Sequence, residues 1–183
     1  SGTTGKPKGV MLSHKNIASN AKHSKGRLHI VMGESKALSF LPVCHIYERM
    51  LLYMYQYCGV SIHFAESLET ISENLKEINP EVMTAVPRLL EKVYDKIIAK
   101  GSDLTGVKSK LFFWAVNLGL QWEPYGQNGW WYETQLKLAR KLIFSKWQEA
   151  LGGNLEAIAS GSAALQPRLA RVFNAAGCPV MEG

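Results

Sequence analysis

Short apolar runs alternate with helical patterns along most of this chain, and this alternation is the strongest constraint on its fold. The runs occupy residues 36–41, 60–64, 81–86, 155–159 and 179–181. Between them, apolar residues recur at helical spacing over residues 46–57, 68–78, 87–100 and 167–176. Strands that are separated by helices pair in parallel through right-handed crossovers. The pattern therefore predicts an α/β fold with a doubly wound, mostly parallel sheet that is flanked by helices.

The segments that follow the predicted strands are rich in Gly, Ser and His. In open parallel sheets, ligands bind beyond the carboxyl ends of the strands. We therefore expect the binding site to be built from residues 42–49, 87–88, 160–163 and 182–183.

Local signals place the ends of several elements. Residues 9–12 have the pattern of the return strand of a hairpin, and Ser13 is a suitable N-cap for a helix that runs to about residue 25. Ser67 is expected to cap the helix over residues 68–78, and Gly101 to end the helix that Pro87 begins. The basic residues near the first helix are interpreted as a solvated face: Lys15, Lys22, Lys25 and Arg27.

Residues 102–153 interrupt the alternation and are interpreted as a helical insertion. Two helical stretches, over residues 107–121 and 132–151, flank a turn-rich segment at 124–129. All five tryptophans of the chain lie here among basic residues. Such a helix pair could lie on a membrane surface, stack on nucleic acid or pack against the rest of the domain. The helical spacing of Leu111, Trp114 and Leu118 favours packing.

Composition limits the class of protein. The 183 residues, of which 46% are hydrophobic, are enough for one domain with a core. A net charge of +6 favours anionic ligands or surfaces without selecting one. The apolar runs are shorter than the roughly 18 residues of a membrane-spanning helix, so no span is expected. Three cysteines without metal-ligand spacing indicate a reducing cytosol and no disulfide.

The ends of the sequence suggest a fragment. The chain has no initiator methionine and no signal-like segment, and it begins within a glycine-rich motif. We expect a site that is assembled from several loops to be only partly present.

Residues 1–9, Ser-Gly-Thr-Thr-Gly-Lys-Pro-Lys-Gly, have the composition of an anion-binding loop. Glycine allows the backbone to approach an anion closely, hydroxyl groups donate to phosphate oxygens, and lysine supplies a compact positive charge. The spacing is not that of a Walker A motif, because Pro7 interrupts it. The residues alone fit either a polyphosphate loop or a glycine-rich turn.

Residues 1–14 together resemble the phosphate loop of the adenylate-forming superfamily, which includes acyl-CoA synthetases, luciferases and peptide adenylation domains. In that family the loop holds the β- and γ-phosphates of ATP while a carboxylate attacks the α-phosphate. The resemblance implies that Thr4 also contacts Mg²⁺. It implies nucleotide binding by Ser1, Gly2, Thr3, Thr4, Gly5 and Lys8.

Residues 41–49, Leu-Pro-Val-Cys-His-Ile-Tyr-Glu-Arg, resemble a second signature, in the form typical of long-chain fatty acyl-CoA synthetases. A lone histidine is commonly a core residue, but the resemblance implies that His45 contacts the phosphate or the acyl adenylate. As a hydrogen-bond donor, His45 could stabilise charge at the α-phosphate without acting as a base. Residues 85–94 resemble a further segment of the same subgroup, in which Arg88 is either structural or a ligand contact.

Two more segments resemble the nucleotide site of this family. Residues 160–165 resemble the Gly-Gly-Ala-Pro segment that lines adenine, which implies adenine contacts for Gly161, Ser162 and Ala163. Ser162 replaces the second glycine of that segment, and Ala164 replaces its proline. Glu182 and Gly183 match the opening of a signature whose later Thr and Glu help to hold Mg²⁺ and the phosphates.

The resemblance covers the whole chain and implies part of the AMP-binding domain of a long-chain fatty acid–CoA ligase. Such an enzyme makes acyl-AMP and pyrophosphate from ATP and a fatty acid, and then transfers the acyl group to the CoA thiol. The implied cofactors are ATP, Mg²⁺ and CoA as co-substrate, with small-molecule substrates and no nucleic acid. The implied location is cytoplasmic, with peripheral contact to the inner face of a membrane and the oligomeric state left open.

Three alternatives to this interpretation stay open. The first is an enzyme that adenylates another carboxylate. The second is a non-catalytic nucleotide- or acyl-binding module. The third is a membrane or nucleic-acid binder that uses residues 102–153, which would leave the motif matches unexplained. The resemblance also implies that this chain alone is inactive, because the C-terminal domain of the family carries a catalytic lysine.

Overall fold

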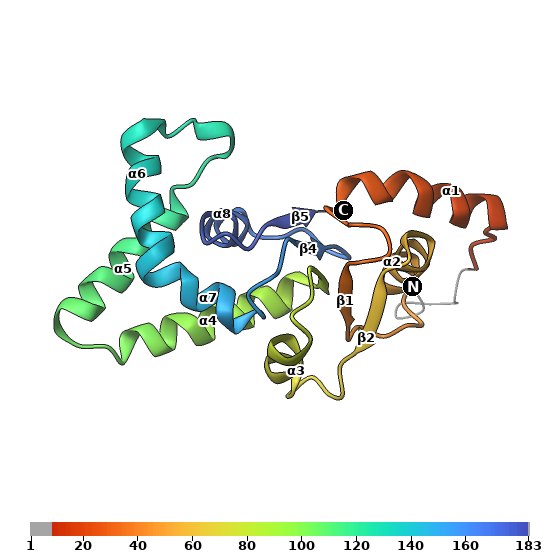
Figure 1. Cartoon of the computed structure of the whole chain (residues 1–183), viewed down its shortest axis with the longest axis horizontal. Helices are drawn as coiled ribbons and strands as arrows, with labels where there is room; N and C mark the ends of the chain where they lie inside the picture. The colour runs from red at the N-terminus through yellow and green to blue at the C-terminus, as the bar shows by residue number, and fades with distance from the viewer. Residues whose placement is uncertain (1–8, 183) are drawn as a thin grey trace.

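The computed structural model describes residues 9–182, which contain a five-stranded parallel sheet (Figure 1). Each pair of neighbouring strands is parallel, and the strand order is β2-β1-β3-β4-β5. The predicted α/β fold with a parallel sheet is confirmed. The strands are β1 (Lys36–Ser39), β2 (Ser61–Phe64), β3 (Val82–Ala85), β4 (Ala157–Ser160) and β5 (Val180–Glu182).

The sheet is doubly wound, because the chain moves from β1 to β2 in one direction and adds β3, β4 and β5 on the other side of β1. Right-handed crossovers then place helices on both faces. Side chains alternate accordingly, since Ala37 and Val82 belong to one buried cluster while Leu38 and Met83 belong to the other. The point at which the winding direction reverses lies between β1 and β3.

The first face of the sheet is covered by α1 (His14–Ser24) and α2 (Ile46–Cys58). Ser13 caps α1 as predicted, since its Oγ accepts a hydrogen bond from the Asn16 N–H at 3.2 Å. A 3₁₀ turn, η1 (Lys25–Arg27), follows α1. Gly59 ends α2 in the left-handed conformation, with φ of 67°, which glycine adopts without strain.

The second face carries the larger core. Trp147 is buried at its centre, with its ring 5.2 Å from that of Phe144 and 6.1 Å from that of Phe173. The helices of this face are α3 (Ile71–Ile78), α4 (Pro87–Ser102), α5 (Gly106–Leu120), α6 (Gly129–Ala139), α7 (Ser145–Ala150) and α8 (Pro167–Ala175). A short turn, η2 (Pro124–Gly126), precedes α6, and a π-helical turn, η3 (Arg140–Phe144), joins α6 to α7. The buried side chains of residues 102–153 therefore pack against the rest of the domain, as the sequence favoured.

Three local predictions were wrong. Residues 9–12 are not a strand, and any hairpin partner would lie in residues 1–8, outside the described residues. The third helix begins at Ile71 because Ser67 and Thr70 bond to each other in a turn, with the Thr70 N–H donating to Ser67 Oγ at 3.3 Å. Gly101 lies inside α4 rather than after it.

Gly101 is where α4 meets α5. It is buried, and a Cβ added there would overlap the ring of Phe112, which is itself buried. Glycine disfavours a helix interior, so its presence here reflects the close approach of the two helices.

The first prediction is that Gly101→Ala destabilises the chain by about 1–3 kcal/mol through overpacking. Helix propensity alone predicts that the free energy of unfolding rises by about 1 kcal/mol, so the sign of its change separates the two effects. Urea unfolding measures this free energy. Gly26→Ala is the matched control, because a Cβ at Gly26 meets nothing within 4 Å. Greater stability of the Gly101→Ala variant would contradict the described packing.

Candidate functional site

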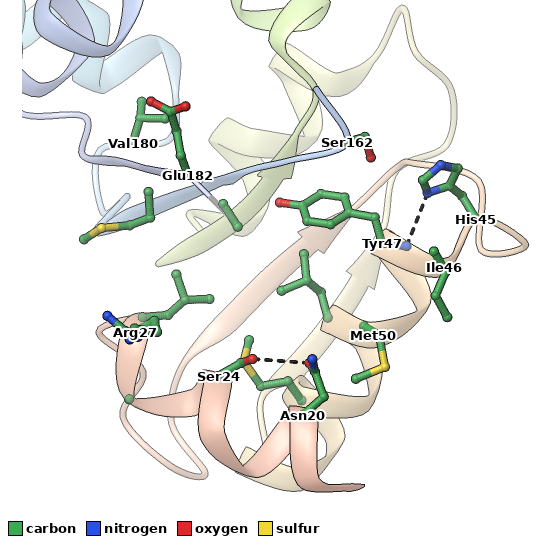
Figure 2. A pocket seen from close by; sticks show the side chains of 16 residues that line it. Asn20, Ser24, Arg27, His45, Ile46, Tyr47, Met50, Ser162, Val180 and Glu182 are labelled. Carbon is green, nitrogen blue, oxygen red and sulfur yellow. Dashed lines mark hydrogen bonds between the residues drawn. The ribbon is translucent and has the colours of Figure 1, made fainter. Parts of the chain in front are cut away.

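A cavity of about 970 Å³ lies on the α1–α2 face, beside the carboxyl ends of β4 and β5 (Figure 2). Its walls combine apolar side chains, such as Met50, Met54 and Met181, with polar groups from four separate segments. This volume and mixture of surfaces are typical of small-molecule sites.

Three of the four predicted loop segments contribute to this cavity. His45 follows β1, Ser162 follows β4 and Glu182 ends β5, and all three line the cavity. The segment after β3 does not contribute, since Arg88 is exposed on the first turn of α4 and is not among the lining residues. The rule that ligands bind at the carboxyl ends of the strands therefore located one side of the cavity, while α1, η1 and the rest of α2 supply most of its lining.

His45 is the N-cap of α2. The ring Nδ1 of His45 accepts a hydrogen bond from the backbone N–H of Tyr47 at 3.2 Å. The backbone N–H of His45 donates to the Pro42 carbonyl oxygen at 2.9 Å. Because Nδ1 accepts, the neutral ring carries its proton on Nε2. The exposed imidazole can thus donate a hydrogen bond to an anion, which is the role that the sequence suggested.

Tyr47 was not singled out from the sequence, although it lies in the same signature. Its ring extends from the start of α2 toward the end of β4 (Figure 2). There it covers Gly161 so closely that a Cβ at Gly161 would overlap the ring. Burial, with a smaller contribution from the charge of Glu48, raises the pKa of Tyr47 to about 12. The tyrosine therefore stays a neutral donor, and Gly161 is needed for its position.

Ser162 adopts a left-handed backbone conformation, with φ of 71°. A non-glycine residue in this region carries strain of order 1 kcal/mol, which explains why a glycine suits this position in the resembling signature. Ser162 is exposed and lines the cavity, whereas Ala163 is exposed and does not line it. Of the three residues with implied adenine contacts, Ser162 lines the cavity directly and Gly161 supports its wall.

The first helix and its 3₁₀ extension supply polar groups that sequence reasoning missed. Asn20, Ser24 and Arg27 line the cavity, and Ser24 Oγ donates to Asn20 Oδ1 at 3.3 Å. Arg27 was expected on a solvated face, but it brings positive charge to the cavity rim. No spacing in the sequence indicated this, because α1 reaches the site only by packing on α2.

Several predicted residues lie outside the described residues. They are Ser1, Gly2, Thr3, Thr4, Gly5 and Lys8 of the phosphate loop, and Gly183. Within residues 9–182, no group of three or more His, Cys, Asp or Glu could hold a metal ion. The described residues alone therefore do not form the Mg²⁺ site that the resemblance implies.

Beneath the cavity, α2 carries a fully buried carboxyl group, Glu48. Its Oε1 accepts a hydrogen bond from the hydroxyl of Ser39, the last residue of β1. Its Oε2 has no hydrogen-bond partner among the described residues, nor do the buried hydroxyls of Tyr55 and Thr84. Burial raises the pKa of Glu48, and the hydrogen bond from Ser39 opposes this rise. The carboxyl group thus joins α2 to the sheet one turn after His45.

Comparison with known proteins identifies the family. The model of the AMP-binding enzyme family matches residues 1–183. The chain therefore belongs to the AMP-binding enzymes.

Its relatives include long-chain acyl-CoA synthetases. The chain is 32% identical to fatty acyl-CoA synthetase A of Dictyostelium discoideum, over 100% of the chain and 27% of that protein. It is 34% identical to long chain acyl-CoA synthetase 3 of Arabidopsis thaliana, over 100% of the chain and 28% of that protein. The chain thus spans about a quarter of the length of these relatives.

Solved structures share the fold. The adenylation and carrier domains of a carboxylic acid reductase from Segniliparus rugosus, in complex with AMP, match 97% of the chain and 21% of that protein. The TM-score is 0.67 at 19% identity. The N-terminal domain of FACL13 from Mycobacterium tuberculosis matches 100% of the chain and 34% of that domain, with a TM-score of 0.59 at 18% identity. These matches confirm the adenylate-forming fold.

The second prediction concerns Glu48. Because its folded-state pKa is raised, the native state holds this proton more tightly than the unfolded state does. The contribution of Glu48 to stability is therefore fully present below the unfolded value near 4.5 and is lost as pH rises through the folded value. Glu48→Gln keeps the shape of the side chain but has no ionisable carboxyl group, so it should remove this loss of stability at rising pH.

Urea unfolding of both proteins at a series of pH values measures the difference. The exposed Glu69 provides a control, since the pKa of its carboxyl group is lowered and Glu69→Gln should not remove the loss at rising pH. A parallel pH dependence in the wild type and Glu48→Gln would show that the fold does not raise the pKa of Glu48.

Proposed function

We propose that this chain is part of an ATP-dependent long-chain fatty acid–CoA ligase. The observation that carries this proposal is the whole-chain match to AMP-binding enzymes, combined with a cavity that three of the resembling signatures surround. The ligase would form acyl-AMP and pyrophosphate from a fatty acid and ATP, and then acyl-CoA and AMP. The names of the relatives support a fatty acid as the substrate, and that of the Arabidopsis relative supports a long-chain one.

The cavity suits an acyl adenylate because it has a polar and an apolar part. His45 would donate a hydrogen bond to the α-phosphate as negative charge develops there. Arg27 would add positive charge at the rim, while Tyr47 and Ser162 would border the nucleotide. The apolar side chains of Met50 and Met54 would take the first part of the acyl chain.

The remaining implied partners belong to the longer ligase. We propose that Ser1, Gly2, Thr3, Thr4, Gly5 and Lys8 hold the ATP phosphates, with Thr4 toward Mg²⁺, and that Glu182 and Gly183 also border the nucleotide. Bound Mg²⁺ would neutralise phosphate charge, and CoA would supply the thiol. A cytoplasmic location at the inner face of a membrane would suit a fatty acid substrate. Within the described residues, no helix is long and apolar enough to cross a bilayer.

The third prediction tests the site in the longer ligase. His45→Ala and Lys8→Ala should each lower palmitate-dependent pyrophosphate release by roughly 10²–10³-fold, because each removes a donor to the reacting phosphates. Gly161→Ala should also lower it, by displacing Tyr47. Lys22→Ala, on the exposed face of α1, is the control and should keep full activity.

If all four variants keep equal activity, the site assignment is wrong. A chain-length panel of fatty acids on the unaltered ligase separates a long-chain enzyme from one for another carboxylate. A preference for short or aromatic acids would contradict the proposed substrate.

The fourth prediction is that the 183-residue chain alone releases no palmitate-dependent pyrophosphate. It spans about a quarter of the length of its relatives, and the loss of even two donors of about 3 kcal/mol each slows a reaction by more than 10⁴-fold. The assay compares the purified chain with the longer ligase. Turnover by the chain within a hundredfold of the ligase would refute the prediction.

A further inference from the structure

A buried polar cluster between α2 and the sheet is not used by the proposed ligase reaction. It joins the side of α2 that packs on the strands to the ends of β1 and β3. Its four side chains are fully buried, each with 0% exposure. We call it the Glu48 cluster: Ser39, Glu48, Tyr55 and Thr84.

The positions of these residues in their elements bring them together. Ala37 of β1 faces α2, and so does the residue of β3 that pairs with it. Two residues further along each strand, Ser39 and Thr84 therefore face α2 as well. Glu48 and Tyr55 are seven residues apart on α2, so they lie on the same side of the helix. The cluster thus lies at β1 and β3, where the winding direction of the sheet reverses.

The cluster contains more polar atoms than hydrogen bonds. Glu48 Oε1 accepts a hydrogen bond from the Ser39 hydroxyl. Within residues 9–182, no partner is found for Glu48 Oε2 or for the hydroxyls of Tyr55 and Thr84. Buried polar groups without partners are unfavourable, and apolar side chains of similar volume are often at least as stable in their place. Stability alone therefore does not account for a carboxyl group here.

Glu48 does not act as a helix cap either. It is the third residue of α2, a position from which an acidic side chain commonly bonds back to the backbone N–H of the N-cap residue. That N–H belongs to His45 and donates to the Pro42 carbonyl oxygen instead. The Glu48 side chain is directed to the sheet, so its contact concerns the placement of the helix on β1.

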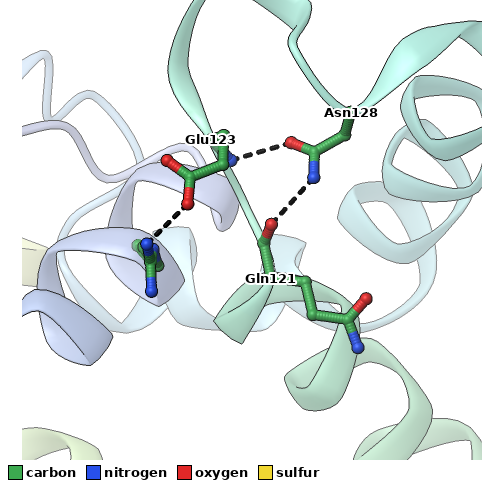
Figure 3. A network of polar contacts seen from close by, with 4 residues as sticks. Gln121, Glu123 and Asn128 are labelled. Carbon is green, nitrogen blue, oxygen red and sulfur yellow. Dashed lines mark hydrogen bonds and ion pairs between the residues drawn. The ribbon is translucent and has the colours of Figure 1, made fainter.

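The carboxylate of Glu123 is bound in a different way (Figure 3). It forms an ion pair with Arg171 of α8 at 2.5 Å, and the side chains of Arg171 and Glu123 are 43% and 39% exposed. The Glu123 N–H donates to Asn128 Oδ1 at 2.8 Å, and Asn128 Nδ2 donates to the Gln121 carbonyl oxygen at 2.9 Å. None of these residues lines the cavity. Glu123 is therefore a suitable comparison for Glu48: a partnered, accessible carboxylate away from the site.

The cavity residues that α2 carries have little freedom of position. The Tyr47 ring covers Gly161 so closely that a Cβ there would overlap it, and the Tyr47 N–H donates to His45 Nδ1 (Figure 2). A small rotation of α2 would displace both side chains. Apolar packing is non-directional and does not fix such a rotation, whereas a hydrogen bond to one hydroxyl of the sheet does.

Glu48 can hold the helix without placing negative charge beneath the phosphate site. Burial raises the pKa of Glu48, which favours the uncharged carboxyl group. An uncharged group one turn after His45 does not repel the phosphates that His45 would contact. A glutamine side chain has the same shape and can accept the same hydrogen bond.

We propose that Glu48 is a positioning residue for acyl-AMP formation. Through Ser39 it fixes the first turn of α2 on the end of β1, so that His45 and Tyr47 meet the substrate in the correct place. Glu48 itself does not line the cavity. The inference rests on the proposed ligase function and adds to it a residue that acts through two others.

Steady-state kinetics of palmitate-dependent pyrophosphate release by the longer ligase test the proposal. Glu48→Leu should lower kcat by about 10²-fold, because misplacement of a catalytic group by about 1 Å has an effect of this size. The KM for ATP should change by less than about threefold, since the lost interaction forms only in the transition state. Glu48→Gln should keep kcat within about threefold, because the amide oxygen accepts the hydrogen bond from Ser39.

Two controls separate positioning from general effects. Glu123→Leu makes the same substitution away from the cavity and should keep full activity. Leu75→Ala removes buried apolar volume on α3, so it should lower the midpoint of urea unfolding and keep kcat. Glu48→Leu should show the opposite pattern, with a lower kcat and no loss in the midpoint. A fall in kcat that merely follows the loss of stability in all variants would overturn the proposal.

Ser39→Ala tests the same hydrogen bond from the sheet and replaces Glu48→Leu if that variant does not fold. It should lower kcat at least tenfold, and the double variant Ser39→Ala with Glu48→Leu should lose no more than Glu48→Leu alone, because both remove one interaction. Full activity of folded Ser39→Ala would refute the proposal. Equal losses in Glu48→Gln and Glu48→Leu would also refute it, since they would assign the effect to the charge of Glu48.

Crystal structures of the ligase variants provide a measurement that does not depend on activity. In Glu48→Leu the Tyr47 ring should leave Gly161 and the bond between His45 Nδ1 and the Tyr47 N–H should break, whereas Glu48→Gln should keep both. Unchanged positions of His45 and Tyr47 in Glu48→Leu would overturn the positioning role, whichever acid the ligase accepts. Inactivity of the unaltered ligase toward palmitate would instead refute the proposed function, and these structures would still decide the role of Glu48.

Discussion

The position of α2 against the sheet is the constraint on which the cavity depends. The sheet presents small side chains to this helix, including Ala37, Ala157 and Ala159, so the helix can pack closely on the strands. Glu48 then joins α2 to the end of β1 through Ser39. Since His45 and Tyr47 lie within one turn of Glu48, their positions follow from the same contact. A buried carboxyl group with an unpartnered oxygen is a costly way to hold a helix, which is consistent with a role in positioning rather than in stability alone.

The two faces of the sheet have different roles. The α1–α2 face is thinly covered and contains the cavity, whereas the other face contains the large aromatic core around Trp147. The long crossover between β3 and β4 builds most of that second face and also exposes Trp130 and Trp131. The chain thus places its small-molecule cavity and its large aromatic core on opposite faces of one sheet.

Much of the candidate site could be predicted from the sequence, because motif residues lie directly after strands. His45, Ser162 and Glu182 line one cavity as the rule for parallel sheets indicates. Ala163 does not line the cavity, and Tyr47 and Arg27 were missed. Tyr47 gains its role by contact with Gly161, more than a hundred residues away in the sequence, and no local pattern reports such a contact. The phosphate loop stays a prediction, since residues 1–8 lie outside the described residues.

The sequence by itself determined the order of strands and helices, the cap of α1 and the family resemblance, because these depend on local periodicity, short-range hydrogen bonds and consecutive residue identity. The tertiary structure alone decided that Gly101 lies inside a helix, since the approach of Phe112 is a contact between two helices. It also decided which tryptophans are buried. Trp147 and Trp130 both lie in the aromatic segment 102–153, and the packing of Trp147 against Phe173 of α8 distinguishes the core residue from the exposed one.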